Sequence, residues 1–129
     1  MVRKRMMKLE GMRHEMKQPE AYPSSNSNIV LIGWGSTYGA VKEAVDLLNR
    51  EGFQAKMLHF SEIYPFPSKD FAREIEGRAK FFAIENNYAG QFADLFSFET
   101  GIPISHKILK YDGRPFSPQE ITAQVKGKI

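Results

Sequence analysis

The stretch Ile29-Val-Leu-Ile-Gly-Trp-Gly-Ser-Thr-Tyr-Gly39 decides the fold expected for this chain. Its first four residues form a short, continuously apolar run, which is typical of a central strand in a parallel sheet covered on both faces. Glycines follow at once, and Ser36 or Thr37 can cap a helix after them, with Gly52 placed to end it. The apolar residues of that helix recur at the spacing of one buried face: Val41, Ala44, Val45 and Leu48. The stretch therefore predicts a strand–helix unit of an α/β domain.

The same pattern of a strand followed by a helix repeats along the rest of the chain. Strands are expected at residues 55–60, 80–84 and 102–109, and helices after Ser68, over residues 88–100 and over residues 118–126. The segment Ser117-Pro-Gln-Glu120 is a capping box with proline at the first helical position. Alternating strands and helices with short connections imply right-handed crossovers and a three-layer α/β/α sandwich.

The first 28 residues differ in composition from the rest. Residues 2–16 place apolar side chains on one side of a helix and Arg and Lys around the remainder, so we expect a basic amphipathic leading helix. Residues 18–28 are rich in proline, serine and asparagine and are interpreted as a linker. The expected organisation is a leading helix and linker over residues 1–28 and a compact domain over residues 29–129.

The composition is that of an ordinary globular domain. The chain has 129 residues, enough for one domain, and its 42% hydrophobic and 26% charged residues exclude the disordered class. No run approaches the roughly 18 apolar residues of a membrane span, and the basic start lacks the apolar core of a signal peptide, so we expect a cytoplasmic location. Because the chain has no cysteine, disulfides, thiolate metal sites and iron–sulfur ligation are excluded within it.

The net charge of +3 is concentrated at the two ends of the chain. Residues 1–20 carry six Lys/Arg and three acids, residues 105–129 carry five and two, and the middle carries seven and ten. Nucleic-acid binding requires a basic stripe on one element with aromatic residues interleaved. A nucleic-acid partner is therefore not expected.

The glycine-rich turn over residues 33–39 is the first candidate site. Free backbone N–H groups between a strand and a helix can hold a phosphate. The spacing departs from nucleotide-binding fingerprints, because Tyr38 stands where a third glycine is required and no Gly-Lys-Ser/Thr ending is present. A tight packing turn is the favoured interpretation, and anion binding over Gly35–Gly39 is the alternative. The candidate interface or ligand residues here are Trp34, Gly35, Ser36 and Thr37.

Polar residues after the strand expected at residues 80–84 form the second candidate site. Open α/β sheets place ligands at the carboxyl ends of their strands, where Glu85 can act as a general base and Gln91 as a substrate contact. Alternatively, Asn86 or Asn87 caps the following helix. Glu85 and Gln91 then bond a neighbouring loop or subunit. Because a lone carboxylate lacks a partner acid, histidine or metal ligand, the structural interpretation is favoured and no catalytic residue is predicted.

The remaining distinctive residues favour contacts over chemistry. The segment Tyr64-Pro-Phe-Pro67 has a stiff backbone, and Tyr64 and Phe66 are expected at an interface. Trp34 is interpreted in the same way. The three histidines lie in separate segments without metal-like pairing, so no metal site is predicted.

Six short motifs occur in register along the chain. They are Ile32-Gly-Trp-Gly-Ser-Thr-Tyr-Gly39, Glu43-Ala44, Tyr64-Pro-Phe-Pro67, Ile84-Glu-Asn-Asn87, Gly90-Gln91 and Lys110-Tyr-Asp-Gly-Arg-Pro-Phe116, the last with Arg114 as a further candidate contact. In this order and spacing the chain resembles the C-terminal domain of 2-oxoacid:ferredoxin oxidoreductase alpha subunits, notably of the 2-oxoglutarate type. The basic residues near the start resemble the linker helix before that domain, so the resemblance covers nearly the whole chain.

The resemblance implies a fold similar to the transketolase C-terminal domain, with a mostly parallel sheet of about five strands and one edge strand that can be antiparallel. It implies a holoenzyme that oxidatively decarboxylates a 2-oxoacid to acyl-CoA, using thiamine diphosphate, Mg²⁺ and iron–sulfur clusters, and reduces ferredoxin. These cofactors are expected in other domains and in a beta subunit, with none in this domain.

The chain is therefore expected to be an assembly and interface domain that is not catalytic in isolation. Its expected partners are the other alpha-subunit domains and the beta subunit, with a homodimer left open and no membrane partner. The alternative is a small-molecule or phosphate-binding module that uses the Gly35–Gly39 turn. A freestanding enzyme would need a paired acid/base set, which the sequence does not offer.

Overall fold

The computed structural model describes residues 19–23, 27–61, 79–86, 91–110 and 114–129. The strands are β1 (Glu20–Tyr22), β2 (Ile29–Trp34), β3 (Ala55–Phe60), β4 (Lys80–Glu85) and β5 (His106–Leu109). A 3₁₀ turn, η1 (Gly35–Thr37), precedes helix α2 (Tyr38–Arg50), and the other helices are α3 (Gln91–Thr100) and α4 (Pro118–Lys126). The expected leading helix, Tyr64, Phe66, the helix after Ser68 and Asn87 lie outside the described residues.

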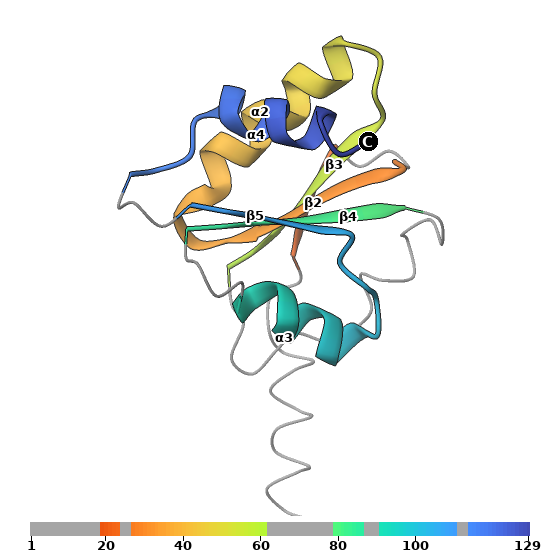
Figure 1. The fold of residues 1–129 in the computed structure, drawn as a ribbon, viewed down its shortest axis with the longest axis vertical. Helices are drawn as coiled ribbons and strands as arrows, with labels where there is room; N and C mark the ends of the chain where they lie inside the picture. Colours follow the sequence, from red (N-terminus) through yellow and green to blue (C-terminus); the bar gives the residue numbers. More distant parts are fainter. Residues whose placement is uncertain (1–18, 24–26, 62–78, 87–90, 111–113) are drawn as a thin grey trace, which may run out of the picture.

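The five strands form one sheet in the order β1-β3-β2-β4-β5. Strands β2 to β5 pair in parallel, and β1 pairs with β3 in antiparallel orientation. Helices α2 and α4 cover one face of the sheet and α3 covers the other, which makes the three layers visible in Figure 1. The predicted α/β/α sandwich with a mostly parallel sheet of five strands and an antiparallel edge is confirmed.

Strand β2 lies in the middle of the sheet because nearly every side chain in it is apolar. Leu31 packs in the cluster under α2 and α4, whereas Val30 and Ile32 pack in the cluster under α3. All three are fully buried. Successive side chains of a strand point to opposite faces, so a strand covered on both faces needs a continuous apolar run.

Helix α2 buries the four residues predicted to face the core: Val41, Ala44, Val45 and Leu48. It ends just before Gly52, whose φ of +95° suits a residue without a Cβ. Of the two predicted caps, Thr37 occupies the N-cap position of α2, but its side chain makes no cap hydrogen bond. The Thr37 hydroxyl instead donates to the carbonyl oxygen of Trp34 at 3.1 Å, so it closes the turn behind it.

The predicted cap of α4 by Ser117 is confirmed, whereas the Glu120 carboxylate, the other half of the predicted capping box, accepts from Lys110. The Ser117 hydroxyl accepts a hydrogen bond from the backbone N–H of Glu120 at 3.1 Å, and Pro118 is the first helical residue. Strand β5 is shorter than predicted and begins at His106. The expected strand fails at its start because Pro103 has no N–H to donate to a neighbouring strand.

The interpretation of residues 18–28 as a linker is wrong for Glu20–Tyr22, which form the edge strand β1. Ala21 pairs with Leu58 of β3. The Tyr22 hydroxyl donates to Asp46 of α2 at 2.9 Å, and the Tyr38 hydroxyl donates to Glu20. Three residues between turn formers carry no periodic signal, so only the distant partners on β3 and α2 define this strand. Of the helices described, none is both long and apolar enough to cross a membrane.

Candidate functional site

The two predicted site segments meet at one edge of the sheet. Strands β2 and β4 are parallel neighbours, with Ile32 opposite Ala83. The chain leaves β2 towards α2 on one face, and the helix that follows β4, α3, lies on the other face (Figure 1). In open α/β sheets, this change of direction between neighbouring strands opens a crevice where ligands bind.

A first cavity of about 320 Å³ lies in this crevice. It is lined by Trp34, Gly35, Ser36, Thr37, Glu85 and Asn86, so the structure brings six predicted residues from two segments together. Gly35 has a φ of +67° and open space where a Cβ would stand. Gln91, another predicted site residue, lies exposed at the start of α3 and does not line the cavity.

Glycine is required at residue 33 because the turn doubles back on the strand. A Cβ at Gly33 would lie 2.7 Å from the Thr37 hydroxyl oxygen, closer than any ordinary contact. This supports the interpretation of the glycine-rich turn as a packing turn. The same close approach brings the start of α2 to the end of β2.

Glu85 is buried at the end of β4, with 2% of its surface exposed. Its carboxylate accepts hydrogen bonds from the backbone N–H groups of Phe92, at 2.8 Å, and Ala93, at 3.1 Å, in the first turn of α3. Two N–H donors at a helix N-terminus stabilise a carboxylate strongly. Glu85 is thus an internal anchor for α3, which favours the structural interpretation of this residue over a general base.

Of the two asparagines predicted to cap the helix after β4, Asn86 makes a different hydrogen bond, and Asn87 lies outside the described residues. The Asn86 amide donates to the carbonyl oxygen of Arg114 at 3.4 Å, which links the end of β4 to the segment before α4. At the start of α3, the carboxylate of Glu85 is an acceptor for two N–H groups.

A second cavity of about 280 Å³ adjoins the first and shares Ser36 and Asn86 with it. Among the described residues, its other lining residues are Lys110, Arg114 and Pro115. The Lys110 side chain is 16% exposed, and its ammonium group donates to both carboxylate oxygens of Glu120, at 2.9 and 2.8 Å, and to Pro115 O at 3.1 Å. These contacts hold the ammonium group between β5 and α4.

Lys110 was not among the predicted site residues, although it belongs to one of the six motifs. It lies in the site because β5 is the parallel neighbour of β4, with Ile108 opposite Ile84, and because its N–H donates to Glu85 O at 3.0 Å. The signal that identifies it is its position one residue beyond a strand, equivalent to that of Asn86. Carboxyl ends of neighbouring parallel strands meet at the same edge of a sheet.

The described residues offer no constellation typical of catalysis. Within them, no three His, Asp or Glu side chains are placed to hold a metal ion. The Nδ1 atom of His59 is buried without a hydrogen-bond partner in the described part, and burial lowers the pKa of this imidazole. His59 packs edge-on against Tyr38, with 4.9 Å between ring centroids, and lines neither of the two cavities.

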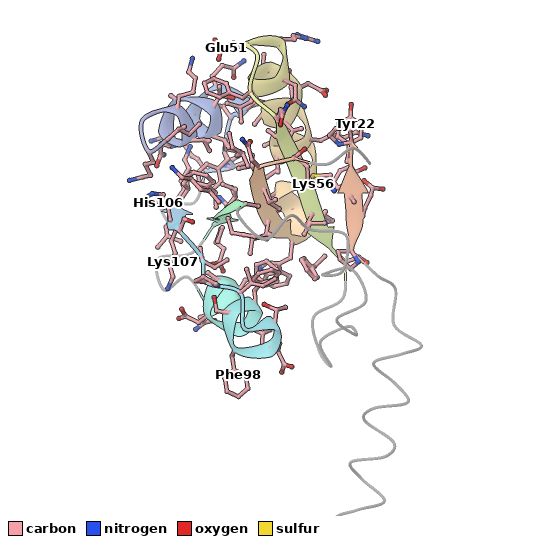
Figure 2. All side chains as sticks on the ribbon, turned by 90° about the vertical axis from the view of Figure 1, so that its right-hand side faces the viewer. Tyr22, Glu51, Lys56, Phe98, His106 and Lys107 are labelled. Atoms are coloured by element: carbon pink, nitrogen blue, oxygen red, sulfur yellow. The ribbon has the colours of Figure 1, made fainter. Side chains whose placement is uncertain are left out.

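Three large apolar side chains of the described residues are exposed, and two of them, Trp34 and Phe98, are aromatic; the third is Ile129. Trp34, at the mouth of the first cavity, is 41% exposed and lies 6.4 Å from the Phe92 ring, measured between ring centroids. Phe98 is 85% exposed and points from α3 away from the sheet (Figure 2). Exposed aromatic residues are common centres of protein–protein contacts.

Comparison with known proteins gives a consistent result. Residues 27–121 match the family described as pyruvate:ferredoxin oxidoreductase core domain II. The chain is 30% identical over 126 residues to the alpha subunit of a 2-oxoacid:ferredoxin oxidoreductase from Saccharolobus solfataricus, covering 98% of this chain and 20% of that one. It is also 30% identical over 129 residues to the 2-oxoglutarate oxidoreductase subunit KorA of Mycobacterium tuberculosis. This match covers 100% of this chain and 19% of KorA.

Solved structures of similar proteins agree. A 2-oxoglutarate:ferredoxin oxidoreductase from Magnetococcus marinus, with 2-oxoglutarate, coenzyme A and succinyl-CoA bound, matches with a TM-score of 0.74 and 30% identity over 88% of this chain and 20% of that one. The alpha chain of a probable 2-oxoacid ferredoxin oxidoreductase from Thermoplasma acidophilum matches with a TM-score of 0.58 and 29% identity. This match covers 85% of this chain and 95% of that one. The chain spans about a fifth of the length of the first curated relatives.

Proposed function

The chain belongs to the pyruvate:ferredoxin oxidoreductase core domain II family, and we propose that it is the C-terminal assembly domain of an alpha subunit in a 2-oxoacid:ferredoxin oxidoreductase. The observation that carries this proposal is the match of 98% of this chain to one fifth of such a subunit. The likenesses do not favour the alternative of a separate phosphate-binding module built on the Gly35–Gly39 turn.

The contacts at the carboxyl edge support a role in assembly rather than in chemistry. The buried carboxylate of Glu85 is held by two N–H groups of α3, and the ammonium group of Lys110 is held by Glu120. Trp34 stands exposed beside these groups. We expect it to be an anchor in the contact with the remaining domains of the alpha subunit, since tryptophan is enriched at the centres of interfaces.

The holoenzyme proposed is a cytoplasmic enzyme that oxidatively decarboxylates a 2-oxoacid to acyl-CoA, with ferredoxin as electron acceptor and a beta subunit as partner. We propose 2-oxoglutarate as the 2-oxoacid, because relatives named for this substrate match over 88% of this chain or more. Iron–sulfur clusters and Mg²⁺ do not fit this domain, since the chain has no cysteine and its described residues contain no group of three His, Asp or Glu for a metal. We therefore assign these groups and thiamine diphosphate to other domains.

Reconstitution tests the proposal. This chain is co-purified with the remaining alpha-subunit domains and the beta subunit, and 2-oxoglutarate-dependent reduction of a viologen dye is measured with and without it. Retention of the chain and gain of activity are expected. A chain that neither binds nor restores dye reduction contradicts the assembly role.

Matched variants locate the contact. Trp34→Ala is expected to weaken retention at least about tenfold, as the loss of an interface anchor does. Phe98→Ala removes an exposed aromatic residue from a different element and is expected to change retention less than about twofold. Loss of retention in Phe98→Ala alone would place the contact on α3 and contradict the use of the carboxyl edge.

A further inference from the structure

We propose that a pH-sensitive clasp holds the edge strand β1 on the domain and loosens when His59 gains a proton as the pH falls. The clasp consists of two side-chain contacts between β1 and α2, and its members are Glu20, Tyr22, Tyr38 and Asp46. None of these residues lines either of the two cavities at the carboxyl edge. The inference goes beyond the assembly role and does not depend on it.

Strand β1 needs side-chain contacts because its backbone pairing is short. It has only three residues, and of the described strands it pairs with β3. An edge strand of this length adds few backbone hydrogen bonds and little buried apolar surface. Such elements open locally at a much lower free energy than the core of a domain. The contacts with α2 therefore decide how firmly β1 is held.

Two tyrosine hydroxyl groups join β1 to α2. The Tyr22 hydroxyl of β1 donates to Asp46 of α2 at 2.9 Å, and the Tyr38 hydroxyl of α2 donates to Glu20 of β1. Both acceptors are carboxylates, so both hydrogen bonds are charge-assisted. The Lys42 ammonium group lies 4.7 Å from the centroid of the Tyr22 ring and 5.6 Å from that of Tyr38, which adds a cation–π attraction between the same two elements.

His59 adjoins one of these two contacts. It is opposite Glu20 in the pairing of β1 with β3, and opposing side chains of an antiparallel pair lie on the same face of the sheet. The Tyr38 ring packs edge-on against the imidazole, with 4.9 Å between ring centroids. The Nδ1 atom of His59 is buried and has no hydrogen-bond partner among the described residues. Both members of the Tyr38–Glu20 contact are thus neighbours of this imidazole.

Protonation of His59 favours release of β1. Burial lowers the pKa of His59 below its ordinary value of 6.5, and the negative charge of Glu20 opposes this shift with a smaller effect. When β1 separates from the domain, water can reach the imidazolium and bond both of its nitrogens. The open state therefore binds the proton more readily. The contribution of neutral His59 to holding β1 is present above pH 6.5 and is lost as the pH falls through the lowered pKa.

The groups around His59 agree with this direction. On α2, the Tyr38 hydroxyl keeps its proton as the donor to Glu20, and Lys42 carries a positive charge that does not favour a second cation nearby. On β2, the residue opposite His59 is Gly33, which has no side chain. On β1, the Glu20 carboxylate already accepts from Tyr38, so an imidazolium would have to compete for it.

Amide hydrogen exchange of the ¹⁵N-labelled chain at pH 8 and pH 5 tests the clasp. Each rate is divided by the rate of an unstructured peptide at the same pH, and β4, which lies inside the sheet, is the internal reference. Between the two pH values, the protection of the hydrogen-bonded amides of residues 20–22 is expected to fall at least about threefold more than that of β4. An equal fall in the two strands overturns the proposal.

Three variants separate the pH response from the contact itself. His59→Gln keeps a polar side chain that does not titrate, and it is expected to abolish the additional pH dependence of β1. Tyr38→Phe keeps the ring beside His59 but removes the donor to Glu20, so it is expected to lower the protection of residues 20–22 at least about threefold at both pH values. His106→Gln is the matched control at the opposite edge of the sheet, and it is expected to change neither property.

Persistence of the additional pH dependence in His59→Gln, or unchanged protection of residues 20–22 in Tyr38→Phe, overturns the clasp. A direct titration of the imidazole signals in the unmodified chain does not depend on whether a variant folds. The midpoint of His59 is expected below pH 6.5, in the range where residues 20–22 lose protection. A midpoint at or above pH 6.5 contradicts the proposed direction of the switch.

Discussion

Helices α2 and α3 begin at the same edge of the sheet, on opposite faces, and their first turns are satisfied in different ways. At α3, the buried carboxylate of Glu85 accepts from two N–H groups of the first turn. At α2, the side chain of the N-cap residue Thr37 makes no cap hydrogen bond and instead donates to the carbonyl oxygen of Trp34. A helix start that the fold itself neutralises contributes to stability, whereas one left open to solvent is available for a ligand or a partner.

The largest effect is expected from removing the internal carboxylate. Glu85→Gln is expected to lower the free energy of unfolding by about 3 kcal/mol, because the amide loses the charge-assisted bonds and offers one acceptor for two buried N–H groups. Urea unfolding followed by circular dichroism measures the change. Asp94→Asn removes an exposed acid from the same first turn and is expected to cost less than about 1 kcal/mol. Equal costs for the two variants contradict the anchor role of Glu85.

The next effect concerns the close approach that starts α2. Gly33→Ala is expected to cost about 2 kcal/mol, because the added Cβ would lie 2.7 Å from the Thr37 hydroxyl oxygen. The double variant Gly33→Ala/Thr37→Ala is expected to recover part of this loss in a double-mutant cycle, since the clashing oxygen is gone. Strictly additive costs would show that the turn relaxes in some other way.

A smaller effect compares a capped helix start with the uncapped one. Ser117→Ala is expected to cost about 1 kcal/mol, because the hydroxyl accepts from the N–H of Glu120 at the start of α4. Ser36→Ala is expected to change stability by less than about 0.5 kcal/mol, since Ser36 is exposed and is not the N-cap residue of α2. Thermal unfolding of both variants provides the comparison. A larger loss of stability in Ser36→Ala than in Ser117→Ala would contradict the assignment of Ser117 as the cap of α4.

The smallest effect depends on pH. Burial lowers the pKa of His59, which packs against Tyr38 at the start of α2, below its ordinary value of 6.5. The unfolded chain then binds more protons than the folded one, so the contribution of neutral His59 is present above pH 6.5 and is lost as the pH falls below it. His59→Gln is expected to reduce the difference between urea midpoints at pH 8 and pH 5. An unchanged difference would show that other groups cause the pH dependence.

Local pattern was sufficient to predict most of the sheet and the site segments. The bounds of β3 and the buried face of α2 agree with the prediction. Both depend on how apolar residues are spaced within one short segment, and this spacing is visible in the sequence. The cap of α4 by Ser117 was predictable for the same reason. The two segments predicted at the carboxyl edge do meet there, because neighbouring parallel strands end at one edge.

Contacts between residues far apart in the chain could not be predicted from the sequence. Strand β1 has only three residues, and its identity comes from β3 and α2. Lys110 enters the site through the pairing of β5 with β4. In each case the deciding contact joins residues more than twenty positions apart, and no local pattern records it.

By itself, the sequence determined the class of fold and the family resemblance, because both depend on residue types at short, regular spacing. Only the tertiary structure decided which of two helix starts would be neutralised from within. Glu85 is the last residue of β4 and Ser36 follows β2, and no local pattern distinguishes a polar residue that bonds inside the fold from one that lines a cavity. The difference arises because the carboxylate of Glu85 is buried against the N–H groups of α3, whereas Ser36 is exposed and lines both cavities.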